Sequence, residues 1–225
     1  MRFVGIDPAT NTGVVILDAD GNPILETVIR GKGRTQPGGI SLEQRVSLQN
    51  QLYRLLQSGD VVIKEAIAHG TPRLITSSKI HGGLEDMITR KGLRFDEVAP
   101  AAVKKFVRAK NHKIVDGVKR KLTSEKEKKG AMAEAALEHF NYSNPSHDVV
   151  DAYIIAQIGM AVHQVRSGEK TLEDFKLIYQ REVIWSIIDP DGYKEYVDKP
   201  KSNKRRGKPA ATDSHTQNTE QTCLF

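Results

Sequence analysis

Apolar and polar residues alternate along the first 30 residues in a pattern that predicts three β-strands. Residues 2–7, 12–18 and 23–30 are rich in β-branched and other apolar side chains, and the turn sequence ADGN separates the last two segments. Connections this short join strands that run in opposite directions. We therefore expect the chain to begin with three consecutive antiparallel strands.

The following segments change from an alternating to a helical period and back. Residues 41–58 place apolar side chains at helical spacing behind a Ser-x-x-Gln capping box. Residues 60–65 and 93–98 are predicted as short strands, and residues 74–91 between them show a helical pattern. This order predicts an α/β fold with a mixed five-stranded sheet, whose first three strands are antiparallel and which carries helices on both faces.

The rest of the domain is predicted to be mainly helical. A short helix starts at Pro100, whereas residues 108–122 show no clear period and are interpreted as a loop. A Ser-x-x-Glu capping box at Ser124 begins a helix that ends near Phe140. Residues 147–166 form a long apolar helix, which a glycine closes shortly afterwards.

The end of the chain differs in composition from the domain. Residues 171–188 are expected to form one more helix, with Trp185 packing it back on the domain. From residue 199 the chain is rich in Lys, Ser, Asn, Gly, Pro, Thr and Gln, a composition typical of disorder. We divide the 225 residues into a domain at 1–168, a helical extension at 169–198 and a disordered basic tail at 199–225.

Composition excludes several classes of protein. The one cysteine, Cys223, allows no intrachain disulfide and no zinc site built on cysteines. The longest apolar-rich stretch, residues 152–162, is too short to span a bilayer, and the chain does not start like a secretory signal. We therefore expect a cytoplasmic protein that does not enter a membrane.

Positive charge is concentrated in two segments. The formal net charge is +6, but residues 101–130 alone hold 11 Lys or Arg and only 3 Asp or Glu. Residues 199–208 add six basic residues and no acid. Clusters of this density favour a polyanionic partner, and nucleic acid is the first candidate.

Four acidic residues stand at positions that a mixed sheet can bring together. Asp7 and Glu65 end the first and fourth predicted strands, and Asp148 and Asp151 lie three apart on one helix face. Close carboxylates repel one another unless a hard divalent cation supplies the countercharge. Two such ions about 4 Å apart stabilise the attacking water and the leaving oxygen of a phosphodiester. The four acids therefore predict a two-metal site.

Each acid also has a simpler explanation. Asp7 precedes a proline and suits a turn, Glu65 suits an exposed strand end, and Asp148 suits the first turn of a helix. Asp151 fits such an explanation least, because an unpaired carboxylate beside the apolar run AYIIA costs free energy. As a set at matching element ends, the four residues favour the metal site.

Four segments resemble the bacterial and phage RuvC Holliday-junction resolvases of the RNase H-like superfamily. They are GIDPATNTG, VVIKEA, PAAVKKFV and HDVVDAYIIA, and the resemblance covers roughly residues 1 to 165. It implies an RNase H-like fold and a homodimeric crossover junction endodeoxyribonuclease. Such an enzyme nicks branched DNA to leave a 5′-phosphate and a 3′-hydroxyl, in a bacterial cell or a phage-infected host.

The resemblance also implies roles for individual residues. Asp7, Glu65, Asp148 and Asp151 fall where the family has its metal-binding acids, which hold two Mg²⁺ ions that Mn²⁺ can replace. Lys104 falls on a phosphate-contacting lysine, and Lys128 or Lys129 falls on a second one. The basic residues expected to contact DNA are Lys104, Lys105, Arg108, Lys110, Lys113, Lys119, Arg120, Lys121, Lys128 and Lys129.

Some positions depart from the family pattern. Ala68, followed by His69, stands where family members often carry an aromatic residue that stacks at the branch point. Residues 108–122 are longer than expected, and the segment after Gly168 has no recognised counterpart. A phage-type enzyme that cuts flaps and forks as well as four-way junctions fits these departures better than a strict resolvase.

The chain ends in TEQTCLF, which places two large apolar residues on a polar tail. Gln221, Leu224 and Phe225 resemble the short peptide with which replication proteins bind a sliding clamp. A chance pair of apolar residues is the alternative, because short motifs match at random.

Two other functions remain open at this stage. A non-catalytic protein that binds branched DNA would show the same basic clusters. An ATPase of the actin or sugar-kinase type also begins with a strand that ends in Asp, although it needs two such domains and a longer chain.

Overall fold

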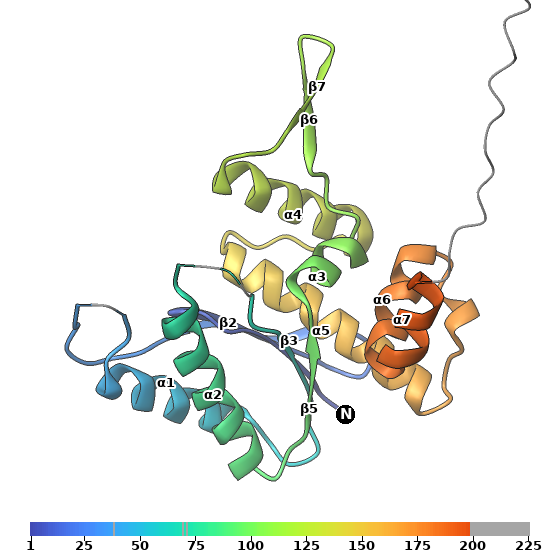
Figure 1. The fold of residues 1–225 in the computed structure, drawn as a ribbon. Helices are drawn as coiled ribbons and strands as arrows, with labels where there is room; N and C mark the ends of the chain where they lie inside the picture. Colours follow the sequence, from blue (N-terminus) through green and yellow to red (C-terminus); the bar gives the residue numbers. More distant parts are fainter. Residues whose placement is uncertain (38, 69, 71, 199–225) are drawn as a thin grey trace, which may run out of the picture.

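The computed structural model describes residues 1–198, apart from residues 38, 69 and 71 (Figure 1). The basic tail at 199–225, and with it the candidate clamp peptide of Gln221, Leu224 and Phe225, lies outside the described residues. Within them, no helix is long and apolar enough to cross a membrane.

A mixed five-stranded sheet forms the centre of the domain, as predicted. Its strand order is β3-β2-β1-β4-β5. The first three strands pair antiparallel, whereas β4 pairs parallel to β1 and β5 pairs parallel to β4. The strands are β1 (Phe3–Asp7), β2 (Asn11–Leu17), β3 (Pro23–Arg30), β4 (Val61–Glu65) and β5 (Phe95–Val98).

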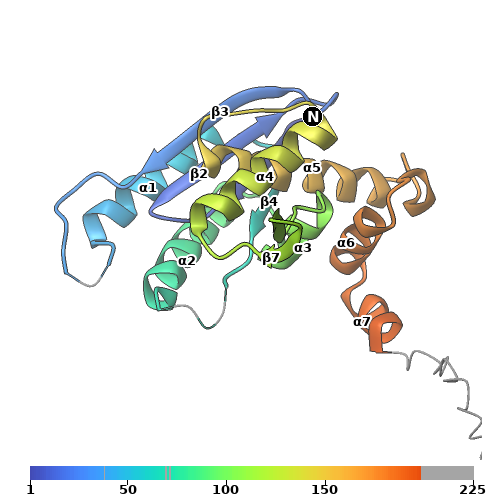
Figure 2. The same ribbon diagram turned by 90° about the horizontal axis from the view of Figure 1, so that it is seen from above.

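Helices cover both faces of this sheet, which also confirms the prediction (Figure 2). One core lies between the sheet and α1 (Leu42–Leu55) with α2 (Leu74–Arg90). The other lies between the sheet and the helices α3 (Pro100–Phe106), α4 (Glu125–Phe140) and α5 (His147–Arg166). The capping boxes predicted at the starts of α1 and α4 are both present.

Helix α5 packs against the sheet more closely than side chains would allow. A Cβ atom added to Gly5 of β1 would lie 2.2 Å from the carbonyl oxygen of Ala152, and one added to Gly13 of β2 would lie 1.9 Å from that of Asp148. Gly159 of α5 similarly leaves room for Ile63 of β4. The backbone of α5 therefore touches the backbone of the central strands.

The interpretation of residues 108–122 as a loop was wrong. They contain a two-stranded hairpin, β6 (His112–Val115) and β7 (Val118–Lys121), which extends away from the domain in Figure 1. Its turn residues Asp116 and Gly117 have φ angles of 52° and 76°, as a tight two-residue turn requires. Most of the side chains in the two strands are exposed, so no apolar period marks them in the sequence.

The prediction of one helix over residues 171–188 was also wrong. The segment forms a 3₁₀ turn, η1 (Leu172–Asp174), and then α6 (Ile178–Ile188), and α7 (Pro190–Asp198) follows. Val183 and Ile184 of α6 enter the core beside α5. Trp185 does not pack on the domain as expected, because its ring lies against Tyr193 and Tyr196 of α7.

We predict that Gly5→Ala destabilises the protein. The added methyl group would overlap the backbone of α5, and overpacking of this kind typically costs about 1–3 kcal/mol. Gly82→Ala in α2 is the matched control: no atom lies within 4 Å of its added Cβ, so removing a helical glycine should stabilise the protein by about 1 kcal/mol. Urea denaturation measures both changes. Equal stability of the two variants would contradict the close contact.

Candidate active site

The ends of two neighbouring parallel strands place two carboxylates side by side. Ile6 of β1 is in register with Lys64 of β4, so the next residues, Asp7 and Glu65, follow together at the same edge of the sheet. Side chains alternate along a strand, and Ile63 packs into the core beneath α5. Glu65, two residues on, therefore points to the same face as α5, as Asp7 does two residues after Gly5.

The beginning of α5 brings the other two acids to this edge. Asp148 and Asp151 lie in its first two turns, and Gly13, the partner of Asp7 in the sheet, touches the carbonyl of Asp148. The charges of Glu65, Asp151 and Asp148 all raise the pKa of Asp7. The structure therefore brings together the four acids that were predicted from the sequence.

Burial and mutual repulsion make three of these carboxylates, those of Asp7, Glu65 and Asp151, hard to ionise. Burial, followed by the charge of Glu65, raises the pKa of Asp7 well above its usual range. Burial and the charge of Asp151 raise the pKa of Glu65 to about 7, although Lys104 opposes them. Burial raises the pKa of Asp151 to about 6 against the opposing charges of Lys129 and Lys104. The charges of Lys104 and Lys129 are therefore too weak to offset burial and repulsion in the acid cluster.

The donor set suits a hard divalent cation. Oxygen ligands from several carboxylates are what Mg²⁺ and Mn²⁺ take in proteins. One oxygen of Asp151, Oδ1, is buried and has no hydrogen-bond partner among the described residues. In the part of the chain that the structure describes, no group of three or more His, Cys, Asp or Glu side chains is already arranged to hold a metal ion. The chemistry of the acids therefore fits the ion, and their side chains would have to adjust to bind it.

A cavity of about 510 Å³ opens over these acids. Asp7, Glu65 and Asp151 line it, whereas Asp148 lies beside it with a carboxylate oxygen 3.9 Å from Lys129 Nζ. Lys104, the predicted phosphate contact, also lines the cavity, and so do both candidates for the second phosphate-contacting lysine, Lys128 and Lys129. The cavity therefore combines acids at its base with cations around them.

Two further residues of this cavity bear on the sequence predictions. Glu125, in the first turn of α4, lines it as an additional acid that sequence reasoning missed. Ala68 lines it as well, at the position where an aromatic side chain was the family expectation. His69 lies outside the described residues. The wall next to Glu65 therefore carries a small side chain at position 68.

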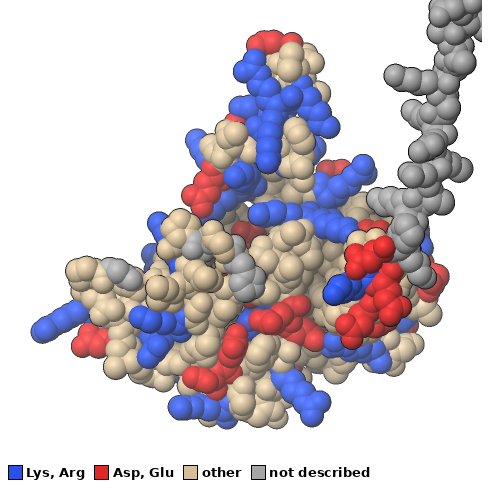
Figure 3. Space-filling view, in the orientation of Figure 1, with Lys and Arg blue, Asp and Glu red and all other residues tan. Residues whose placement is uncertain are grey.

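The remaining predicted DNA contacts are Arg108, whose guanidinium group lies over the ring of Tyr179, and two groups of three residues. Three lysines form ion pairs with acids: Lys105 with Glu182, Lys110 with Glu134, and Lys113 with Glu127. Exposed cations follow the hairpin, where blue side chains cover much of its surface in Figure 3. The hairpin cations of the second group are Lys119, Arg120 and Lys121.

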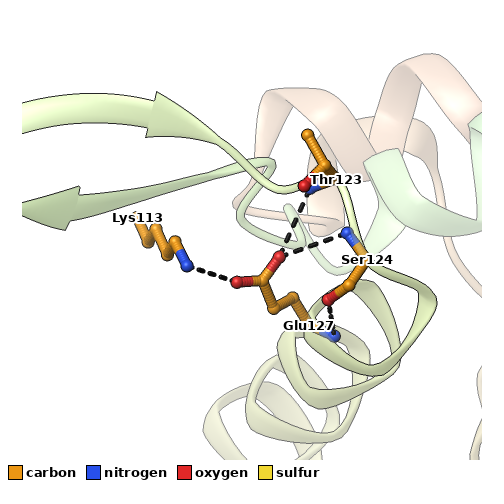
Figure 4. A network of polar contacts seen from close by, with 4 residues as sticks. All are labelled: Lys113, Thr123, Ser124 and Glu127. Atoms are coloured by element: carbon orange, nitrogen blue, oxygen red, sulfur yellow. Dashed lines mark hydrogen bonds and ion pairs between the residues drawn. The ribbon is translucent and has the colours of Figure 1, made fainter.

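The pair between Lys113 and Glu127 anchors the hairpin to α4 (Figure 4). The same Glu127 carboxylate accepts hydrogen bonds from the backbone N–H groups of Thr123 and Ser124. Its hydrogen bond with Lys113, together with those from Ser124, lowers the pKa of Glu127 to about 2. Lys113 was predicted as a DNA contact, and the structure gives it this anchoring partner.

A second lysine, which the sequence gave no reason to single out, stands next to Glu65. Lys64 is completely buried and points to the other face of the sheet, where its Nζ lies 2.9 Å from Glu85 and also pairs with Glu97. Burial and the Lys64 charge lower the pKa of the adjacent His81 to about 4. Lys64 is thus neutralised by carboxylates of α2 and β5, away from the acid cluster.

We predict that Asp7→Asn stabilises the metal-free protein at about pH 8. A carboxyl group with a raised pKa stays protonated in the folded state after the unfolded chain has lost its proton, so folding stability falls as pH rises from about 4 through about 7 and beyond. Asp7→Asn removes the negative charge of Asp7 and therefore part of the stability that the folded protein loses at high pH. Urea denaturation in EDTA should show a gain at about pH 8 that shrinks towards about pH 4.

Asp18→Asn is the control, because it is expected to change stability in the opposite direction. Hydrogen bonds led by the backbone N–H of Asn22 lower the pKa of Asp18, so its carboxylate stabilises the folded state at neutral pH. Asp18→Asn should therefore lower stability at about pH 8, and this loss should disappear as pH falls through the lowered pKa. A loss of stability in Asp7→Asn as well would contradict the proposed repulsion.

The fold is similar to that of RuvC. No protein-family model and no curated protein sequence matches the chain. Among solved structures, Thermus thermophilus RuvC matches with a TM-score of 0.52 and 16% identity, over 75% of this chain and 97% of that one. Thermus thermophilus RuvC in complex with a Holliday junction substrate matches with a TM-score of 0.53 and 15% identity, with the same coverage. The chain therefore has the RNase H-like fold of RuvC, as its sequence motifs led us to expect.

Proposed function

We propose that the protein is a metal-dependent, structure-selective DNA endonuclease that cuts Holliday junctions and other branched DNA such as flaps and forks. The observation that carries this proposal is the convergence of four carboxylates from β1, β4 and α5 beside a cavity edged with lysines. The RuvC fold supports it, and a RuvC with this fold has been solved with a Holliday junction substrate.

The acids and the lysines have separate roles in this proposal. Asp7, Glu65, Asp148 and Asp151 would hold two Mg²⁺ ions, for which Mn²⁺ can substitute. When bound, the ions would activate the attacking water and stabilise the leaving oxygen of the phosphodiester. Lys104, Lys128 and Lys129 face the same cavity, and their charges would hold the scissile phosphate over the acids. Hydrolysis would leave 5′-phosphate and 3′-hydroxyl ends.

DNA beyond the scissile phosphate would lie along the hairpin. Its Lys119, Arg120 and Lys121 are exposed, and the hairpin projects from the domain in Figure 1. Thr123, two residues after β7, lines the cavity over the acids. Contacts of this kind neutralise backbone phosphates whatever the base sequence, so the protein would recognise the shape of the branch.

Assembly and location complete the proposal. A four-way junction is resolved by two nicks, which two copies of the chain in a homodimer would make. The enzyme would act in the cytoplasm of a bacterial or phage-infected cell. Gln221, Leu224 and Phe225, outside the described residues, would tether it to a sliding clamp.

We predict that Asp7→Asn abolishes cleavage and keeps or improves DNA binding. The substitution removes a metal ligand and also a negative charge that repels phosphate. The nicking rate should fall about 10³-fold or more in Mg²⁺, because metal-ion catalysis supplies several kcal/mol. The measurement uses four-way junction, flap, fork and linear duplex DNA, each with Mg²⁺ and with EDTA.

The control for this experiment is Asp20→Asn, which removes an exposed acid from the turn between β2 and β3. It should cut DNA like the unaltered protein. Cleavage by Asp7→Asn at the normal rate would overturn the metal-site assignment. If the unaltered protein binds branched DNA equally well with and without EDTA and does not cut it in Mg²⁺ or Mn²⁺, the non-catalytic alternative holds. Hydrolysis of ATP by the protein would instead favour the ATPase alternative.

We also predict that Lys119→Ala and Arg120→Ala weaken binding to every branched DNA. Each should reduce the slope of log affinity against log salt by about 1, because one phosphate contact is lost. Lys32→Ala removes an exposed lysine before α1 and should leave the slope unchanged. Fluorescence anisotropy over a series of salt concentrations measures the slopes. Identical slopes for hairpin and control variants would show that DNA does not follow the hairpin.

A further inference from the structure

A second cavity, of about 500 Å³, adjoins the first. The two share Lys104, Lys128 and Met132 as lining residues, so whatever occupies the second cavity lies next to the acids. Its walls come from α3, the base of the hairpin, α4 and α6. A volume of this size falls within the range of about 300–1,000 Å³ that is typical of small-ligand sites.

The charge of this second cavity is positive only. Lys104, Lys105, Arg108, Lys110, Lys121 and Lys128 line it, and no acidic residue among the described residues does. Glu182 and Glu134 pair with Lys105 and Lys110 from outside the lining. Like charges gathered around one space repel, and an anionic ligand would remove the repulsion. This distinguishes the second cavity from the first, whose lining includes Asp7, Glu65 and Asp151.

The floor of the second cavity is apolar. Leu122 and Met132 lie there almost fully buried, with Ala101, Ala109 and the ring of Tyr179 around them. The guanidinium group of Arg108 lies over that ring, 5.9 Å from its centre. A bare phosphate ion gains nothing from an apolar floor. A ligand with a flat apolar part and a negatively charged part matches both halves of the cavity, and a nucleotide has both.

We propose that the second cavity binds an unpaired nucleotide of the DNA strand that is cut. Its base would lie on the apolar floor beside Tyr179, and its phosphates would meet the surrounding lysines and Arg108. In a duplex the flat faces of the bases are covered by stacking, so only an unpaired or extruded nucleotide can reach the floor. This inference rests on the proposed nuclease function and adds a substrate class: branched DNA with an unpaired nucleotide beside the scissile phosphate.

The first test fills the cavity. Ala101 is exposed on α3 and lines the second cavity but not the first, so Ala101→Trp blocks the floor without touching the acids. The ratio of kcat/KM for a flap with an unpaired nucleotide beside the cut to that for a fully paired four-way junction should fall about tenfold, the scale of one lost base contact. Leu137→Trp, an equally bulky change at an exposed position of α4 outside both cavities, should leave the ratio unchanged.

The second test needs no variant. The unaltered protein is irradiated in EDTA with a flap that carries 5-iodouracil at the unpaired position, and the cross-linked peptide is identified by mass spectrometry. A cross-link to Tyr179 supports the inference. A cross-link elsewhere would overturn the inference, and so would an equal change of the kcat/KM ratio in Ala101→Trp and Leu137→Trp. In either case, cleavage of both substrates by the unaltered protein would leave the proposed nuclease function intact. If no branched DNA is cut in Mg²⁺ or Mn²⁺, the proposed function fails, and the cross-link alone then decides whether the cavity binds a nucleotide.

Discussion

The contact between the backbone of α5 and the central strands is the constraint on which the candidate site depends. Gly5 and Gly13 leave no side chain between the sheet and the helix, so the acids of α5 cannot move away from Asp7 unless the helix itself moves. The apolar residues of α5, most of them completely buried, hold it there. Hydrophobic burial thus offsets the repulsion of carboxylates that would separate if they were free.

The charges of the molecule are sorted in space around that contact. Carboxylates lie at the base of the first cavity with cations around them, whereas the charged residues that line the second cavity are all cations. Ion pairs then divide the cations. Lys105 and Lys113 fix α6 and the hairpin to the domain through Glu182 and Glu127, whereas Lys104 and Lys128 face both cavities. Counting basic residues along the sequence cannot make this division, because the partner acids are distant in the chain or belong to caps.

The parts of the fold that bury one face were predictable, and the parts that bury little were not. Strands and helices of the domain show clear periods, and Asp7 and Glu65 were recognised because they end such strands. The hairpin was missed because its strands expose most positions, although Asp116-Gly117 between two β-prone segments is a strong turn signal. Gly5 and Gly13 carry no sign in the sequence of what they touch, and the ion pairs of Lys64 depend on elements that only folding brings together.

The neighbouring side chains of Lys64 and Glu65 also protect the pairing of β4 from error. The Lys64 side chain faces the carboxylates of Glu85 on α2 and Glu97 on β5. The Glu65 side chain lies on the opposite face of the sheet, next to Asp151 of α5. If β4 slid by a single position against β1, every side chain would change faces. The carboxylate of Glu65 would then meet Glu85 and Glu97, which would have lost the Lys64 ammonium group that neutralises them. Repulsion among three carboxylates on one face of the sheet therefore penalises the shifted alignment.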